Sequence, residues 1–262
     1  MTVTIAAISG KGGTGKTTTV INLSCALAEL GKTVLAVDMD PQANLTSGIG
    51  YDPYRLEETV FQALTGESPN GASLIKTEYG VHLIPSSPDL SAVEAALQGG
   101  PGRELILRGV LERLTHGGTS YDYVLVDTPP NFGFHTLNAL AAADYILVPL
   151  QMSGFAIKGL KEVLRTVAAA RQRLNSDVRI LGILPTFVNL RTNFSRDMLE
   201  ALHDLPNLPV FDSLVKSTVK LAETSLEGVP ILNYASTSDA ALAYRNLAGE
   251  VIAKVEGRAT NV

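Results

Sequence analysis

The residues whose types and spacing suggest chemistry most directly lie near the start of the chain, where glycines and two lysines occupy positions 10–17. This segment, GKGGTGKT, matches the phosphate-binding loop (P-loop) pattern GxxxxGK[ST] and stands between an expected strand at Val3–Ile8 and an expected helix at Lys16–Leu30. Glycines allow backbone N–H groups to surround phosphates, and the helix N-terminus adds a positive dipole end. We therefore expect Lys16 to reach the β- and γ-phosphates and the Thr17 hydroxyl to bind Mg²⁺. A glycine-rich turn without a ligand is the alternative, which the flanking strand and helix disfavour.

Two aspartates follow the second expected strand, Thr33–Val37, in the sequence DMDPQ. The carboxyl edge of an α/β sheet is where ligands bind, so both Asp38 and Asp40 are placed for chemistry. Pro41 ends the strand and constrains the backbone at Asp40. From this position the Asp40 carboxylate could orient a water molecule or contact the ligands of a bound metal. The role of Asp38 stays open, and a turn with a helix cap is the alternative for the pair.

A third carboxylate ends a run of apolar residues at Tyr123–Val126. Asp127 would hold Mg²⁺ opposite Thr17, directly or through water, and Thr128 and two prolines follow it. A buried strand that ends in such a turn is common, so this motif alone is weak. Together with the phosphate-binding loop it becomes specific.

The elements that must position these residues alternate between short β-branched runs and longer amphipathic stretches, which is typical of an α/β fold. The further expected strands are Val81–Ile84, Tyr145–Val148, Val178–Leu184 and Pro209–Phe211. The further expected helices are Leu90–Leu97, Glu104–Leu114, Ile157–Leu174, Phe194–Leu202 and Asp239–Val255. Glycine-rich segments at 99–102 and 117–118 are expected turns. We expect a single domain over residues 1–262, with a mostly parallel twisted sheet covered by helices on both faces.

Composition excludes several classes of protein. The 262 residues are 45% hydrophobic and carry a net charge of -5, and no apolar stretch reaches the roughly 18 residues of a membrane span. The start of the chain lacks the basic region of a signal peptide, so we expect a cytoplasmic protein. A single cysteine, Cys25, forms no internal disulfide, and the spacing of the four histidines does not suit a metal cluster. An acidic chain would bind DNA only through a local patch.

The segment Lys11–Thr18 resembles the deviant Walker A motif of the ParA/MinD superfamily of ATPases. In that family the early lysine crosses a nucleotide-sandwich dimer to touch the partner's ATP, which implies catalytic roles for Lys11 and Lys16. The resemblance also makes residues 38–46 switch I, with Asp40 positioning the attacking water, and residues 123–134 the Walker B motif and switch II. The implied nucleotide-binding residues are Lys11, Gly12, Gly13, Thr14, Gly15, Lys16, Thr17 and Thr18, with Thr186 near the base.

The resemblance covers nearly the whole chain and includes Lys216–Glu223, which is similar to a basic segment of ParA/Soj proteins. Residues 155–220 hold ten basic and six acidic side chains. Solvent-exposed helix faces would by themselves explain this excess of basic residues. The resemblance instead favours nonspecific DNA binding. The implied DNA-contacting residues are Lys216, Lys220, Arg191 and Arg196.

Two alternatives remain beside a ParA/Soj-type ATPase. A MinD-like regulator would end in a basic amphipathic helix, whereas Ala240–Val255 holds only Arg245 and Lys254 as bases. The other is a small-molecule P-loop enzyme related to dethiobiotin synthetase. The resemblance to ParA/Soj-type ATPases, which we favour, implies a slow Mg-dependent ATP hydrolase with ATP and Mg²⁺ as cofactors. It also implies a homodimer when ATP is bound. Its partners would be nonspecific double-stranded DNA and a ParB-like activator, without a membrane, and its location the nucleoid in the cytoplasm.

Overall fold

The computed structural model describes residues 2–68, 72–97, 100, 102–116, 120–206 and 208–259. The turn expected at 117–118 lies outside the described residues, as do residues 99 and 101 of the other glycine-rich turn.

The described part of the chain forms one eight-stranded sheet in the order β3-β4-β2-β5-β1-β6-β7-β8. The strands are β1 (Val3–Ala7), β2 (Val34–Asp38), β3 (Ile75–Lys76), β4 (Val81–Ile84), β5 (Tyr123–Asp127), β6 (Tyr145–Gln151), β7 (Arg179–Val188) and β8 (Val215–Lys216). All neighbours pair in parallel except β3 and β4, which are antiparallel. The expected α/β class and mostly parallel sheet are confirmed.

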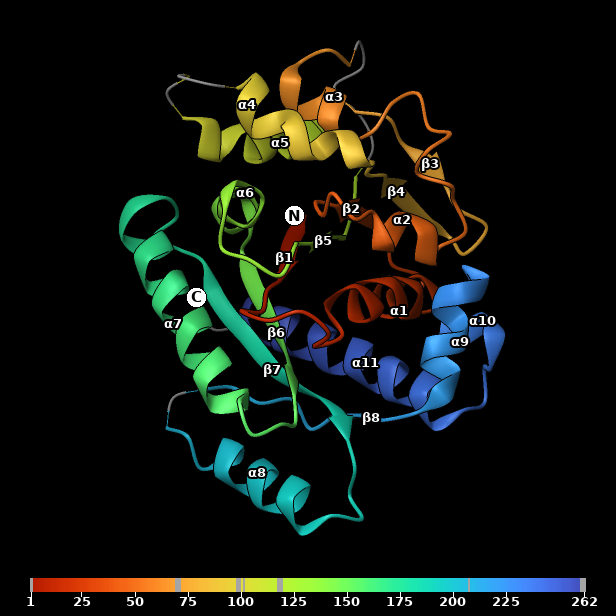
Figure 1. Ribbon diagram of the computed structural model, residues 1–262, viewed down its shortest axis with the longest axis vertical. Coiled ribbons are helices and arrows are strands. Elements are labelled where there is room, and N and C mark those ends of the chain that lie inside the picture. The colour runs from red at the N-terminus through yellow and green to blue at the C-terminus, as the bar shows by residue number, and fades with distance from the viewer. Residues whose placement is uncertain are drawn as a thin grey trace.

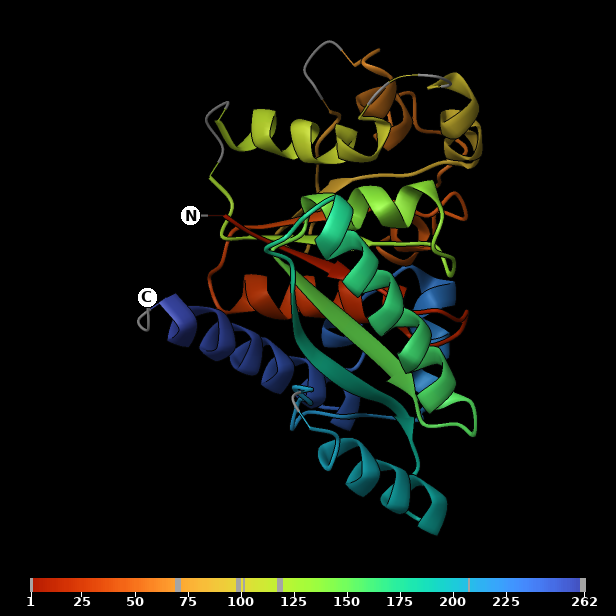
Figure 2. The ribbon, with the colours of Figure 1, turned by 90° about the vertical axis from the view of Figure 1, so that its left-hand side faces the viewer.

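Helices cover both faces of this sheet (Figures 1 and 2). They are α1 (Lys16–Glu29), α2 (Asn44–Gly48), α3 (Val60–Thr65), α4 (Val93–Ala96), α5 (Ile106–His116), α6 (Phe134–Ala142), α7 (Ala156–Arg173), α8 (Asn193–His203), α9 (Val219–Glu227), α10 (Ile231–Tyr234) and α11 (Asp239–Ala259), with short 3₁₀ turns at Pro88–Ala92 and Arg103–Leu105. One buried apolar cluster packs α3 to α8 on one face, and a second packs α1, α2 and α9 to α11 on the other. The sheet is therefore buried on both sides, which explains its continuous apolar strands.

The last helix, expected at Asp239–Val255, packs on the domain. Tyr244, Leu247 and Val251 of α11 are buried in the same apolar cluster as Leu23 and Leu27 of α1. Among the described helices, none combines the length and apolarity that crossing a membrane requires.

The strand expected at Pro209–Phe211 is reduced to a single parallel bridge between Val210 and Ile183. The ring of Phe211 occupies the space above Gly182, where an added Cβ would lie 2.5 Å from the ring. This segment follows a bulge in β7, since Ile146 pairs with Ile180 and the next pair joins Leu147 to Gly182. The segment thus adds only two backbone hydrogen bonds to the sheet, from the Ile183 N–H to the Pro209 carbonyl and from the Phe211 N–H to the Ile183 carbonyl, while the Phe211 ring packs over Gly182.

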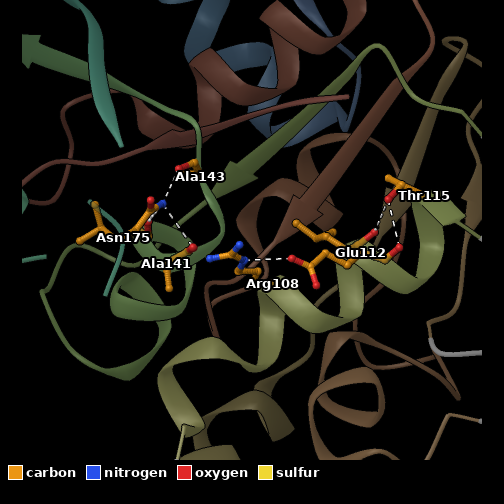
Figure 3. Close-up of polar contacts among 8 residues, drawn as sticks. Arg108, Glu112, Thr115, Ala141, Ala143 and Asn175 are labelled. Carbon is orange, nitrogen blue, oxygen red and sulfur yellow. Dashed lines mark hydrogen bonds and ion pairs between the residues drawn. The ribbon is translucent and has the colours of Figure 1, made fainter. Parts of the chain in front are cut away.

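Helix α6, which positions the segment after Asp127, was not predicted from the sequence. Its residues are apolar on most sides, so it shows no clear amphipathic period. The side-chain amide of Asn175 closes its C-terminal end by donating to the carbonyl oxygens of Leu140, Ala141 and Ala143, as Figure 3 shows in part. The N-terminal end of α6 therefore lies toward the carboxyl edge of the sheet.

Candidate nucleotide-binding site

The three predicted motifs meet because they follow neighbouring parallel strands. Asp38 at the end of β2 is the register partner of Asp127 at the end of β5, and Asp127 also pairs with Ala7 at the end of β1. The phosphate-binding loop follows β1 and leads into α1. Gly13 and Gly15 have φ angles of 73° and 85°, which a side chain would strain, so the loop needs glycine at these two positions.

Lys16 is held inside the loop by a small network. Its Nζ donates to Ser9 Oγ at 3.0 Å, Thr14 Oγ1 donates to the same oxygen at 2.9 Å, and Ser9 Oγ donates to the Lys11 carbonyl at 2.8 Å. Burial lowers the pKa of Lys16, against the opposing effects of Asp127 and Asp40. The lysine is therefore fixed near the loop before any phosphate arrives, and Ser9 is a member of this network that the sequence pattern does not reveal.

Thr17 and Asp127 lie in direct contact. The Thr17 hydroxyl donates to Asp127 Oδ2 at 2.6 Å, while the buried Oδ1 has no hydrogen-bond partner among the described residues. Burial, together with the neighbouring Asp38, raises the pKa of Asp127 to about 8. A hydroxyl beside an unsatisfied carboxylate oxygen is an oxygen donor set that suits Mg²⁺, so the residues present fit the expected metal.

Asp38 organises the loop after β2. Its Oδ1 accepts from the backbone N–H of Asp40 at 3.1 Å, and its Oδ2 accepts from the backbone and hydroxyl of Thr46 at 2.9 and 2.7 Å. Burial raises the pKa of Asp38 to about 6, although these hydrogen bonds oppose the shift. The question that the sequence left open thus has a structural answer: the side chain of Asp38 ties the two ends of residues 38–46 together.

Asp40 faces the same cavity as the phosphate-binding loop. This cavity has a volume of about 430 Å³, and Lys16, Thr17, Gln42 and Asp40 are among the residues that line it. Asp40 Oδ1 accepts from the Gln42 N–H at 2.9 Å, and its backbone carbonyl accepts from Ser86 Oγ at 2.8 Å. The residue as a whole is 5% exposed, and the part that remains accessible faces this cavity.

A second cavity of about 220 Å³ adjoins the first and shares Gly15, Thr18, Phe187 and Ser225 with it. It is also lined by Thr186, Val215, Thr218, Leu221, Ala222 and Tyr244. Thr186 donates its hydroxyl to the Thr14 carbonyl at 2.8 Å and so ties β7 to the loop. A mostly apolar cavity beside a phosphate-binding loop suits a nucleotide base. Apart from Thr186, none of the residues confined to this cavity was predicted to bind the nucleotide, because they come from distant elements.

Lys11 does not join the phosphate cavity of its own chain. Its side chain is exposed, and its Nζ lies 5.0 Å from the centroid of the Phe155 ring, over the segment between β6 and α7. Such a contact between a cation and an aromatic face is weakly attractive at an exposed position. The structure therefore brings together every predicted loop residue except this lysine.

The four predicted DNA-contacting residues are all exposed and come from two regions. Lys216 ends β8 and Lys220 lies in the first turn of α9, whereas Arg191 precedes α8 and Arg196 lies within it. Lys216 Nζ forms an ion pair with Asp239 Oδ2 at 2.9 Å. Arg196 donates to the side chain of Asn193.

The fold and this site define a P-loop nucleotide-binding protein. A family model described as an AAA domain matches residues 2–180. The chain is 42% identical to the chromosome-partitioning ATPase Soj of Thermus thermophilus over 96% of each chain. It is 38% identical to the chromosome partitioning protein ParA of Myxococcus xanthus, over 92% of this chain and 85% of that one. The chain belongs to the ParA/Soj family of P-loop ATPases.

A solved structure with the same fold carries a different name. It is described as cobyrinic acid a,c-diamide synthase from Mycobacterium smegmatis, with bound ADP and magnesium. Its TM-score is 0.85 at 37% sequence identity, over 98% of this chain and 96% of that one. Its bound groups are an adenine nucleotide and the metal that the sequence analysis expects.

The network around Asp38 generates a stability prediction. Thr46→Val removes the hydroxyl that donates to Asp38 Oδ2 and accepts from the Ser86 N–H. Because both groups would be left buried with fewer partners, we expect the free energy of unfolding to fall by about 1–3 kcal/mol. Thr46→Ser keeps the hydroxyl and should lose much less. Urea denaturation of both variants checks this, and equal losses would show that the hydroxyl is unimportant.

Proposed function

We propose that this chain is an ATP-dependent dimerising ATPase that binds DNA nonspecifically and segregates DNA or positions a cargo. A ParB-like partner would stimulate hydrolysis and so release the ATPase from DNA. The proposal places the protein in the cytoplasm, associated with the nucleoid. Cofactors are ATP and Mg²⁺, and basal turnover is slow.

The observation that carries the proposal is the position of Lys11. The loop of one chain already holds Lys16 for the phosphates, and the ammonium group of Lys11 lies outward over Phe155. An exposed lysine on the rim of a phosphate site is available to a second copy of the chain. Its charge would then stabilise the phosphate of the partner, as an arginine finger does.

The other residues take roles that their positions support. Thr17 and Asp127 would hold Mg²⁺, Asp127 directly or through water, and the bound metal would neutralise phosphate charge. Lys16 and the backbone of residues 12–18 would bind the phosphates. The Asp40 carboxylate would orient the attacking water, because it faces the phosphate cavity. Thr186 would lie beside the base, because it lines the second cavity.

A second candidate is a small-molecule enzyme, favoured by the name of the Mycobacterium smegmatis neighbour. Such an enzyme would turn over ATP in response to a small carboxylic acid and would not need DNA. A MinD-like membrane role has less support, because α11 buries Tyr244, Leu247 and Val251 in the same apolar cluster as α1.

The proposed function predicts ATP-dependent binding to DNA. The purified protein should bind nonspecific duplex DNA with ATP, and much less with ADP or without nucleotide, as measured by fluorescence anisotropy at low and moderate salt. Lys220→Glu reverses an exposed charge and should abolish this binding. Absence of binding with every nucleotide would contradict the proposal, and ATP turnover that depends on a small carboxylic acid would support the second candidate.

The second prediction separates binding from turnover. Asp40→Ala should keep ATP binding and ATP-dependent DNA binding but lose hydrolysis, because it removes the carboxylate proposed to position water and leaves the residues proposed to bind phosphate unchanged. Lys16→Ala should lose nucleotide binding, because phosphate charge would be left uncompensated in the loop. Calorimetric titration and phosphate release measure both. Unchanged hydrolysis by Asp40→Ala would remove this residue from the mechanism.

A further inference from the structure

One of the four predicted DNA-contacting cations is already neutralised within the chain. Lys216 Nζ lies 2.9 Å from Asp239 Oδ2, with both side chains at least half exposed to solvent. In the described part of the chain, neither Lys220, Arg191 nor Arg196 forms an ion pair with a carboxylate. Lys216 is therefore distinguished from the other three by a negative charge at hydrogen-bond distance.

Both ends of this ion pair are attached to well-anchored backbone. Lys216 is paired in register with Val188 of β7, and the next residue, Ser217, donates its N–H to the Val188 carbonyl at 3.2 Å. Asp239 begins α11, which is anchored by the buried side chains of Tyr244 and Leu247. Because both backbone positions are already fixed by the fold, forming this pair costs less backbone entropy than a pair between mobile loops.

The acceptor in this pair resembles the ligand that the lysine is expected to bind. A carboxylate and a DNA phosphate both offer anionic oxygens to the same ammonium group, so the two compete for its positive charge. The hydrogen bond from Lys216 lowers the pKa of Asp239, so the carboxylate stays charged near neutral pH. Lys216 is also close to the nucleotide site, because Val215 and Thr218 on either side of it line the second cavity.

We propose that Asp239 masks Lys216 and weakens DNA binding in the resting protein, so that a DNA phosphate must displace the Asp239 carboxylate before Lys216 contacts DNA. This inference rests on the DNA binding proposed above. Displacement leaves Asp239 exposed and free to attract a cation. That uptake offsets part of the cation release that drives binding to DNA, so masking reduces both the affinity and its salt dependence.

The test compares two variants that change the same charge on the same helix. Asp239→Asn removes the mask but retains a side chain of similar size. Glu256→Gln breaks the ion pair of Lys32 and Glu256, which also measures 2.9 Å and lies near the other end of α11. At 1.5 Å per residue, the two positions are about 25 Å apart along the helix. Both variants raise the net charge by one, so the control reports the effect of net charge, and the Lys216→Ala background reports the effect of removing a carboxylate at position 239 itself.

With ATP present, Asp239→Asn should bind nonspecific duplex DNA about two- to fivefold more tightly than Glu256→Gln, which corresponds to the upper range for an exposed ion pair. The slope of log affinity against log salt should also become steeper, by up to about 0.9 for each lysine released. In a Lys216→Ala background, Asp239→Asn should gain no more than Glu256→Gln does. Thermal denaturation checks that each variant is folded.

Two results would overturn the inference and can be told apart. If the unaltered chain binds DNA with ATP but Asp239→Asn matches Glu256→Gln in affinity and salt slope, Asp239 is not a mask while the proposed function stands. If neither the unaltered chain nor Asp239→Asn binds DNA with any nucleotide, both the mask and the proposed function are wrong.

Discussion

The burial of two carboxylates side by side is the constraint on which the rest of the site depends. Asp38 and Asp127 end neighbouring strands, are register partners and are fully buried. Two such groups cannot both stay charged in a protein interior without partners. Thr46 satisfies one of them, while Thr17 and Lys16 compensate the other only in part, since Asp127 Oδ1 is left without a hydrogen-bond partner among the described residues. Because Asp127 Oδ1 forms no hydrogen bond, it is available to bind a cation at this edge of the sheet.

The sheet order explains why this constraint can be met at one point. β1 lies between β5 and β6, so chain connections diverge to opposite sides of it, and a crevice forms where they separate. The phosphate-binding loop fills this crevice and is tied to both halves of the sheet. Thr17 contacts Asp127 at the end of β5, and the Thr14 carbonyl accepts from Thr186 at the end of β7. The loop is thereby linked through short hydrogen bonds to Asp127 on one side and, through Thr186, to the second cavity on the other.

Much of this was predictable from sequence, because the signals are local. The loop at 10–17, the aspartates that end β2 and β5 and the continuous apolar strands are each written in fewer than ten consecutive residues. The parts that failed depend on contacts between distant segments. Thr46 and Ser86 belong to the site only because they form hydrogen bonds with Asp38 and Asp40. The expected strand at Pro209–Phe211 is reduced to one bridge, and the Phe211 ring packs in the space that Gly182 leaves. Helix α6 was missed because its residues are apolar on most sides, which hides its helical period.

The central claim of this account is that one chain holds an incomplete site, which Lys11 of a second copy completes. The direct measurement is the mass of the protein in solution by sedimentation velocity, in an Asp40→Ala background that preserves bound ATP. The account predicts a dimer with ATP and a monomer with ADP, and a monomer with ATP when Lys11→Ala is added, although ATP still binds. A monomer with every nucleotide, or a dimer that persists without the Lys11 side chain, would contradict it.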